Sequence, residues 1–107
     1  MFEIAHYLTR HGRDLYQEWL EGLRDRSVEA RITVRVARLA AGAFGDCKPV
    51  GKGVWELRAH FGPGYRIYYA RAGERLILLL SGGDKGSQRH DIEEAIACWK
   101  DYRERQT

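Results

Sequence analysis

The stretch GVWELRAHFGPGYRIYYA, residues 53–70, predicts two β-strands joined by a Gly-Pro-Gly turn, because β-forming residues flank the turn on both sides. Side chains alternate between the two faces of a strand. One face of the hairpin therefore receives apolar side chains: Trp55, Leu57, Ala59, Phe61, Ile67 and Tyr69. The opposite face receives polar and charged ones: Glu56, Arg58, His60, Arg66 and Tyr68. This charged face is the first candidate for a functional site.

The remaining chain predicts three more strands and three helices. Strands are expected at residues 2–7, 47–50 and 76–80, and the last of these, LILLL, is apolar enough for a central strand covered on both faces. Helices are expected after three capping residues, Thr9, Ser27 and Ser87. Their buried stripes are Leu15, Trp19 and Leu23, then Val28, Ile32, Val36 and Leu39, then Ile92, Ile96 and Trp99. The order βααββββα predicts an α+β fold with helices packed on one face of a largely antiparallel sheet, which leaves the charged face open.

Length and composition indicate one globular domain over residues 1–107, with 44% hydrophobic residues and two prolines. The N-terminus lacks a signal-peptide pattern and the longest apolar run is five residues, so a cytoplasmic protein without membrane contact is expected. Cys47 and Cys98 are expected to be reduced thiols. Residues 47–92 hold eight Lys/Arg and four Asp/Glu, a local excess of +4, whereas residues 1–46 hold seven of each. The excess favours an anionic partner such as nucleic acid or an acidic protein.

Two long segments, AGAFGDCKPVGKGVWELRAHFGPGYRIYYA and LILLLSGGDKGSQRHDIEEA, resemble the RelE/ParE superfamily of toxins from bacterial type II toxin-antitoxin modules, in particular its HigB-like group of addiction-module killer proteins. The resemblance implies a small RelE-like fold, neutralisation by a cognate antitoxin of helix-turn-helix type, and cleavage of mRNA on the ribosome. ParE-type members of the superfamily instead poison DNA gyrase, so the fold alone leaves the target open. A degenerate homologue that only binds its antitoxin is the third alternative.

RNA cleavage without a metal or other cofactor needs a deprotonated 2′-hydroxyl, stabilised charge on the phosphorane, and a proton for the leaving 5′-oxygen. Arg58 and Arg66 share one predicted sheet face, where their guanidinium groups could hold phosphate oxygens bidentately. The alternative is that both arginines simply pair with Glu56 across the strands. Glu56 could accept a proton, but Arg58 should lower its pKa, which favours an orienting role. Tyr68 could stack on an unpaired base or donate a proton.

Five further residues are predicted to bind RNA. Lys48, Lys52 and Lys85 are expected at strand ends and loops around the charged face, where they could neutralise backbone phosphates. Arg89 and Lys85 also match the GGDK-Q segment of the resembled family, which leads into the last helix. Gln88 could either read a base edge or cap that helix. His60 and His90 have side chains suited to proton transfer, but surface histidines remain the default interpretation for both.

Overall fold

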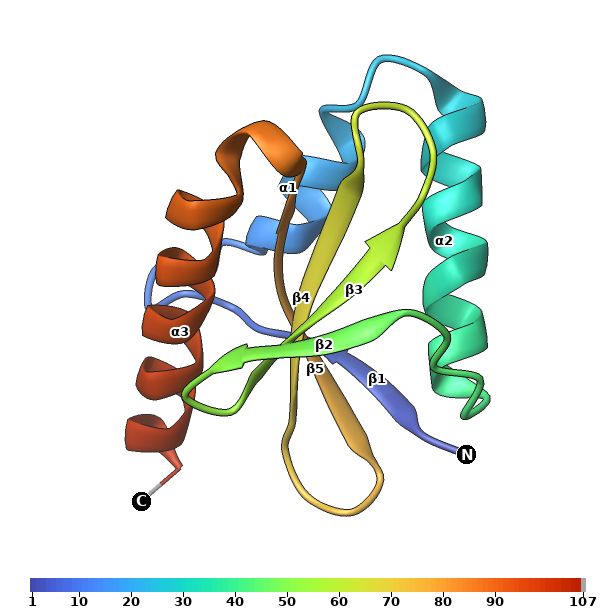
Figure 1. Ribbon diagram of the computed structural model, residues 1–107. Helices are drawn as coiled ribbons and strands as arrows, with labels where there is room; N and C mark the ends of the chain where they lie inside the picture. The colour runs from blue at the N-terminus through green and yellow to red at the C-terminus, as the bar shows by residue number, and fades with distance from the viewer. Residues whose placement is uncertain (107) are drawn as a thin grey trace.

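The computed structural model describes residues 1–106, and its elements follow the predicted order (Figure 1). The strands are β1 (Glu3–His6), β2 (Cys47–Gly51), β3 (Val54–Ala59), β4 (Tyr65–Arg71) and β5 (Leu76–Gly83). The helices are α1 (Leu15–Glu21), α2 (Arg26–Ala40) and α3 (Gln88–Arg105), the last preceded by a short 3-10 turn, η1 (Lys85–Ser87). The α+β class and the order of elements are thus confirmed.

The five strands form one sheet in the order β1-β5-β4-β3-β2. Strands β2 to β5 are antiparallel neighbours, whereas β1 pairs with β5 in parallel, with Glu3 opposite Leu76. The sheet is therefore largely antiparallel, as predicted. The apolar run at the start of β5 is interior to the sheet and buried on both faces, which also confirms the prediction for that segment.

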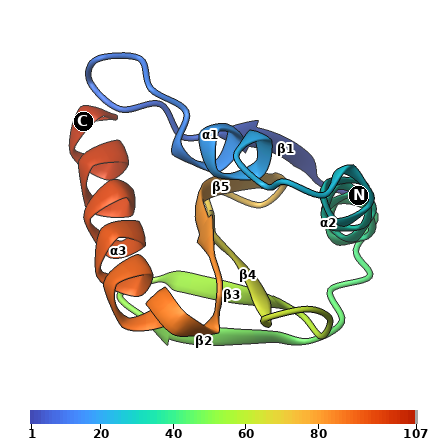
Figure 2. The ribbon, with the colours of Figure 1, turned by 90° about the horizontal axis from the view of Figure 1, so that it is seen from above.

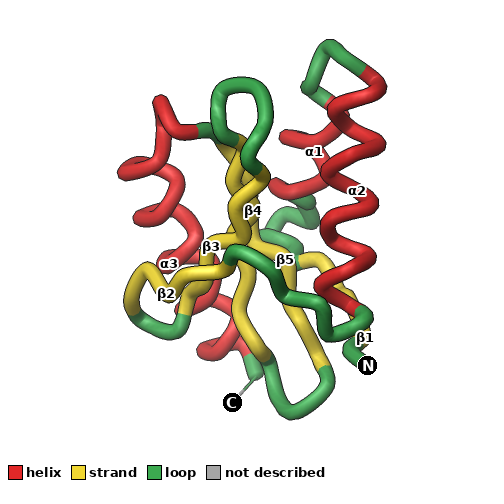
Figure 3. The backbone as a smooth tube through the Cα atoms, turned by 45° about the vertical axis from the view of Figure 1, so that its right-hand side comes forward, coloured by secondary structure: helices red, strands yellow, loops and turns green. Residues whose placement is uncertain are grey.

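Helices α1 and α2 cover one face of the sheet (Figure 3). Their buried side chains form the larger core together with alternate residues of β3, β4 and β5: Tyr16, Leu20, Ile32, Val36, Leu39, Leu57, Ile67, Tyr69, Ile77 and Leu79. This is the face that the alternation in residues 53–70 identified as apolar. The hydrophobic pattern of the hairpin therefore placed the main core correctly.

The prediction that all helices lie on one face is wrong, because α3 packs on the other face (Figure 2). A second core forms there between α3 and the sheet: Tyr7, Val54, Tyr68, Ala70, Leu78, Leu80, Ala95 and Cys98. The central strand β5 is apolar on both sides, so it needs cover on both. Small residues on α3, Ala95 and Cys98, let the helix approach closely. Helix α3 therefore covers much of the charged face that was predicted to be open. Only the end of the sheet beyond the start of α3 stays uncovered.

The first two helices are capped by aspartates instead of the predicted caps Thr9 and Ser27. Asp14 caps α1 and Asp25 caps α2, each accepting a hydrogen bond from a backbone N–H in the first turn. Threonine, serine and aspartate are all favoured caps, so local propensity could not separate these four positions. Ser87 does precede α3 as predicted, but its side chain makes no capping hydrogen bond to the backbone.

Candidate functional site

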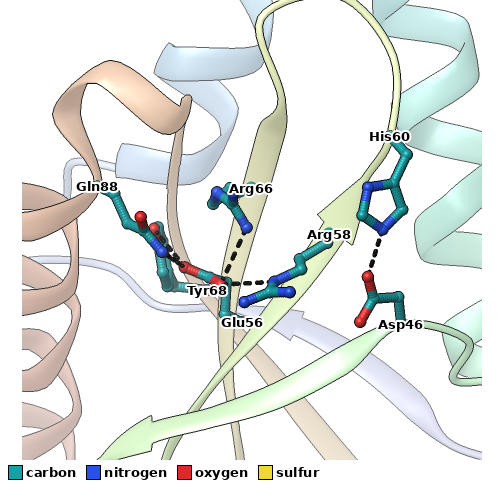
Figure 4. A network of polar contacts seen from close by, with 7 residues as sticks. All are labelled: Asp46, Glu56, Arg58, His60, Arg66, Tyr68 and Gln88. Carbon is teal, nitrogen blue, oxygen red and sulfur yellow. Dashed lines mark hydrogen bonds and ion pairs between the residues drawn. The ribbon is translucent and has the colours of Figure 1, made fainter.

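A buried carboxylate forms the centre of the candidate site. The side chain of Glu56 on β3 is fully buried and accepts four hydrogen bonds (Figure 4). The donors are Arg58 Nε at 3.1 Å, Arg66 Nη1 at 3.1 Å, Tyr68 Oη at 3.0 Å and Gln88 Nε2 at 2.9 Å. These five residues are called the Glu56 network below. It comprises all four residues predicted to be catalytic and one predicted RNA-binding residue.

Strand register explains how the network assembles. Glu56 lies opposite Tyr68, and Arg58 lies opposite Arg66, in the antiparallel pair of β3 and β4. All four side chains share one sheet face because their positions alternate in step. Gln88 comes from 32 residues further along the chain, at the first position of α3, and closes the remaining side of the carboxylate. The network therefore joins α3 to the sheet.

The donors around Glu56 decide its protonation state. Burial alone would raise the pKa of this carboxyl, but hydrogen bonds from Gln88, Arg58 and Tyr68, together with the charge of Arg66, outweigh burial and lower it. The carboxylate is therefore ionised at neutral pH. With its lone pairs occupied by four donors it is a poor proton acceptor. The predicted lowering of the Glu56 pKa is confirmed.

Tyr68 is placed differently from the expectation. Its ring is fully buried under α3, so the predicted stacking on a nucleotide base is wrong. Burial and the adjacent Glu56 carboxylate raise the pKa of its hydroxyl, which stays protonated and donates to Glu56. The sequence pattern grouped Tyr68 with polar residues, although a phenol has one polar atom and buries most of its ring readily.

The two arginines reach the surface only in part. The exposed fraction of the side chain is 27% for Arg58 and 13% for Arg66, so the expectation of two solvent-facing arginines is only partly met. Each pairs with Glu56 through one nitrogen. Arg58 keeps both terminal nitrogens uncommitted to the carboxylate, and Arg66 Nε is buried without a hydrogen-bond partner among the described residues. Both guanidiniums are thus held in place; Arg58 keeps two terminal nitrogens that Glu56 does not use, whereas the unused Nε of Arg66 is buried.

The other predicted RNA-binding residues lie outside the Glu56 network. Lys48 is exposed on β2, Lys52 is exposed in the turn between β2 and β3, and Lys85 is exposed in η1. Arg89 is exposed in the first turn of α3. Of the five residues predicted to contact RNA, only Gln88 joins the buried carboxylate. The role of the three lysines and Arg89 stays a prediction.

An open groove adjoins the network on the side facing α2. It has a volume of about 790 Å³ and runs between α2 and the end of β3. Its charged and polar lining comes from six residues: Arg31, Arg35, Arg38, Asp46, Arg58 and His60. Arg58 belongs to both the groove and the Glu56 network. The three α2 arginines that line the groove were missed as site residues, although their spacing of four and three residues places them on one helix face.

His60 and Asp46 form a hydrogen-bonded pair in this groove, on the α2 side of Arg58 (Figure 4). The hydrogen bond to His60 lowers the pKa of the Asp46 carboxyl. The backbone carbonyl of Asp46 also accepts from Arg58 N at 2.9 Å, which ties the loop before β2 to β3. The imidazole of His60 is exposed and therefore accessible from the groove.

Two other features bear on the kind of site present. Among residues 1–106, no helix is both long and apolar enough to cross a lipid bilayer. Within the same residues, His, Cys, Asp and Glu side chains do not gather in groups of three or more that could hold a metal ion. The donors that the Glu56 network does offer are guanidinium and amide N–H groups, which suit a phosphate or carboxylate ligand.

Comparison with known proteins identifies the family. The sequence model of the family described as "Phage derived protein Gp49-like (DUF891)" matches residues 18–100. The chain belongs to this family. The Gp49-like family consists of RelE-like toxins of toxin-antitoxin systems, which implies an antitoxin as partner. The matched range contains the whole Glu56 network and the groove arginines.

A relative from Haemophilus influenzae, described as an uncharacterized protein, is 42% identical over 80 residues. The aligned region covers 75% of this chain and 81% of the relative. The family match over residues 18–100 confirms the predicted resemblance to RelE-like toxins at the level of the family.

Proposed function

We propose that this Gp49-like protein is a HigB-like toxin that cleaves mRNA on the translating ribosome in the cytoplasm, without a metal ion. The observation that carries this proposal is the buried Glu56 carboxylate, which fixes the guanidiniums of Arg58 and Arg66 on paired strands at the edge of a basic groove. Such an arrangement suits a phosphodiester, whose negative charge increases when a 2′-hydroxyl attacks it.

The roles of the network follow from its geometry. Arg58 binds the scissile phosphate through its two terminal nitrogens, and Arg66 adds positive charge from the neighbouring strand. Glu56, Tyr68 and Gln88 act as positioning residues, since the Tyr68 hydroxyl and the Gln88 amide nitrogen both donate to the Glu56 carboxylate. Donors that are fixed before the substrate arrives need little reorganisation in the transition state, which makes them effective at stabilising its charge.

In this proposal proton transfer is assigned to His60 instead of Glu56 or Tyr68. Glu56 is ionised with its oxygens occupied, and the Tyr68 hydroxyl is buried with a raised pKa, so neither can exchange protons readily with an RNA substrate. His60 is the exposed imidazole of the groove that Arg58 also lines. In this proposal the ribosome positions the mRNA, and this positioning contributes part of the rate.

The partner is an antitoxin, which we propose to be of the helix-turn-helix type. The excess of +4 on residues 47–92 would speed association with an acidic surface. Lys48 and Lys85, both exposed, are placed to contribute to this steering. Replacing each by glutamate and measuring the association rate across a salt series tests the idea, since unchanged rates and salt slope would exclude electrostatic masking at these positions.

The function is tested by inducing wild-type toxin, Arg58→Ala and Arg75→Ala in bacterial cells and mapping the 5′ ends of mRNA. Arg75 is an exposed arginine in the turn before β5, so its substitution is the matched control. Loss of one fixed donor costs about 2.7–4 kcal/mol of transition-state stabilisation, or roughly 10²–10³ in rate. We expect wild type and Arg75→Ala to cut mRNA within codons and stop growth, and Arg58→Ala to do neither while remaining folded by circular dichroism.

Other outcomes would overturn the proposal. Intact mRNA with an SOS response and gyrase-linked DNA breaks would identify a ParE-type gyrase poison. Normal growth on wild-type induction would indicate a homologue that only binds its antitoxin. Full cleavage by Arg58→Ala would remove this arginine from the site, and Arg58→Lys should restore activity only in part, because an ammonium lacks the guanidinium fork.

A further inference from the structure

The groove between α2 and the end of β3 is distinct from the buried network and has its own charge pattern. Arg31, Arg35 and Arg38 follow one another along one face of α2, and Arg31 and Arg38 are seven positions apart, about 10 Å along the helix. Arg58 stands on the strand side. The groove therefore has guanidinium groups on both walls.

The three α2 arginines of the groove are not neutralised by a carboxylate of the described residues. Across the part of the chain that the structure describes, Arg31, Arg35 and Arg38 form no ion pair with a carboxylate. Arg35 instead donates to the backbone carbonyl of Phe44. The carboxylate that lines the groove, Asp46, is bound by His60. The groove thus presents uncompensated positive charge.

The walls also offer flat and apolar surface. The guanidinium carbon of Arg31 lies 3.8 Å from the centroid of the Phe61 ring, so the two planar groups are held against each other. Val34, an exposed residue, lines the groove together with Ala30. Arginine planes and aromatic rings are surfaces on which unpaired bases stack, in addition to the phosphate contacts that arginine makes.

We propose that this groove binds a single-stranded RNA segment through its sugar-phosphate backbone, with Arg31 and Arg38 as phosphate contacts. The inference rests on the proposed function in one respect, because Arg58 lines the groove and also belongs to the Glu56 network, so a strand lying in the groove leads to the proposed cleavage site. That continuity favours RNA over an acidic protein segment as the occupant. Contacts of this kind are independent of sequence and weaken with salt.

Binding is measured by fluorescence anisotropy with a labelled 12-nucleotide 2′-O-methyl RNA, which cannot be cleaved. The groove variant is Arg31→Gln with Arg38→Gln, and Arg35 is kept because it holds the loop at Phe44. The control is Arg75→Gln with Arg103→Gln, which removes the same charge from the β4–β5 turn and from α3. Both variants change the net charge from +3 to +1.

The groove variant should bind at least tenfold more weakly than the control. Its plot of log affinity against log salt should be shallower by about 1.4, since each contact to a single strand contributes about 0.7. Equal affinities and slopes for the two variants, or no binding of this RNA by wild type, would overturn the proposal. The proposal would also be overturned if the groove variant lost binding of a decaglutamate peptide but not of RNA. That result would assign the groove to an acidic protein partner. Because the probe cannot be cut, this assay measures RNA binding independently of cleavage. A protein that failed to cleave mRNA in cells could therefore still bind RNA in the groove.

Discussion

Replacing Glu56 by glutamine should destabilise the protein severely, although the side chain keeps nearly the same size. The carboxylate accepts four hydrogen bonds while fully buried, whereas the single amide oxygen of glutamine can accept two. At least two donors therefore lose their acceptor, and two guanidiniums lose their counter-ion. Hydrogen bonds to a charged group contribute about 1.5–3 kcal/mol each, so we expect a loss of about 3–6 kcal/mol in the free energy of unfolding. Removing one partner of a buried ion pair costs a similar amount.

The assay is urea denaturation followed by tryptophan fluorescence, with Glu74→Gln in the exposed β4–β5 turn as control. The control should change the free energy of unfolding by less than about 0.5 kcal/mol. The folded-state pKa of Glu56 is lowered from its usual 4.5, so its contribution to stability is present above that value and is lost as pH falls through the folded pKa. Glu56→Gln should remove this part of the acid dependence. Wild-type stability in Glu56→Gln, or an unchanged acid dependence, would refute the assignment of Glu56 as an ionised central acceptor.

Three further changes test the packing around the site. Tyr68→Phe should lower the free energy of unfolding by about 1–3 kcal/mol in the same urea assay, because it leaves one carboxylate oxygen short of a donor. Gly82→Ala should cost about 1–3 kcal/mol by thermal unfolding, because a Cβ there would lie 2.2 Å from the ring of Trp19; a melting temperature equal to wild type would contradict this packing. Burial raises the pKa of the Cys98 thiol to about 11, so at pH 8 a thiol reagent should modify Cys47 first and Cys98 only on unfolding.

The alternation in residues 53–70 was sufficient to predict the hairpin, the main core and the strand face that carries the candidate site. It could not predict the cover provided by α3, because that depends on tertiary contacts such as the hydrogen bond from Gln88 to Glu56, 32 residues earlier in the chain, and the packing of Cys98 against the sheet. The sequence also suggested that Arg58 and Arg66 pair with Glu56 across the strands, and both ion pairs are present in the structure. Alternation alone did not reveal that the Glu56 carboxylate is completely buried. Burial makes Glu56 a fixed hydrogen-bond acceptor instead of a surface group.

The groove was missed for a different reason. Counting charges over residues 1–46 gave seven of each sign, and this balance concealed two oppositely charged helices. Helix α1 carries two glutamates and no basic residue, whereas α2 carries four arginines against one glutamate, a net charge of +3. A charge count made for each helix separately would have indicated a basic stripe on α2, because Arg31, Arg35 and Arg38 are spaced to lie on one helix face. Its position beside β3 still required the tertiary structure.

The parallel pairing of β1 with β5 affects when the protein can fold during its own synthesis. Glu3 lies opposite Leu76, a separation of 73 residues along the chain, and α1 also packs on β5. Closing a loop of that length before its contacts form slows folding and delays it until the late strand is available. A nascent chain must therefore release β5 from the ribosomal exit tunnel before its first strand has a partner. Synthesis of at least four-fifths of the polypeptide thus precedes completion of the sheet, of which the strands with Arg58 and Arg66 are a part.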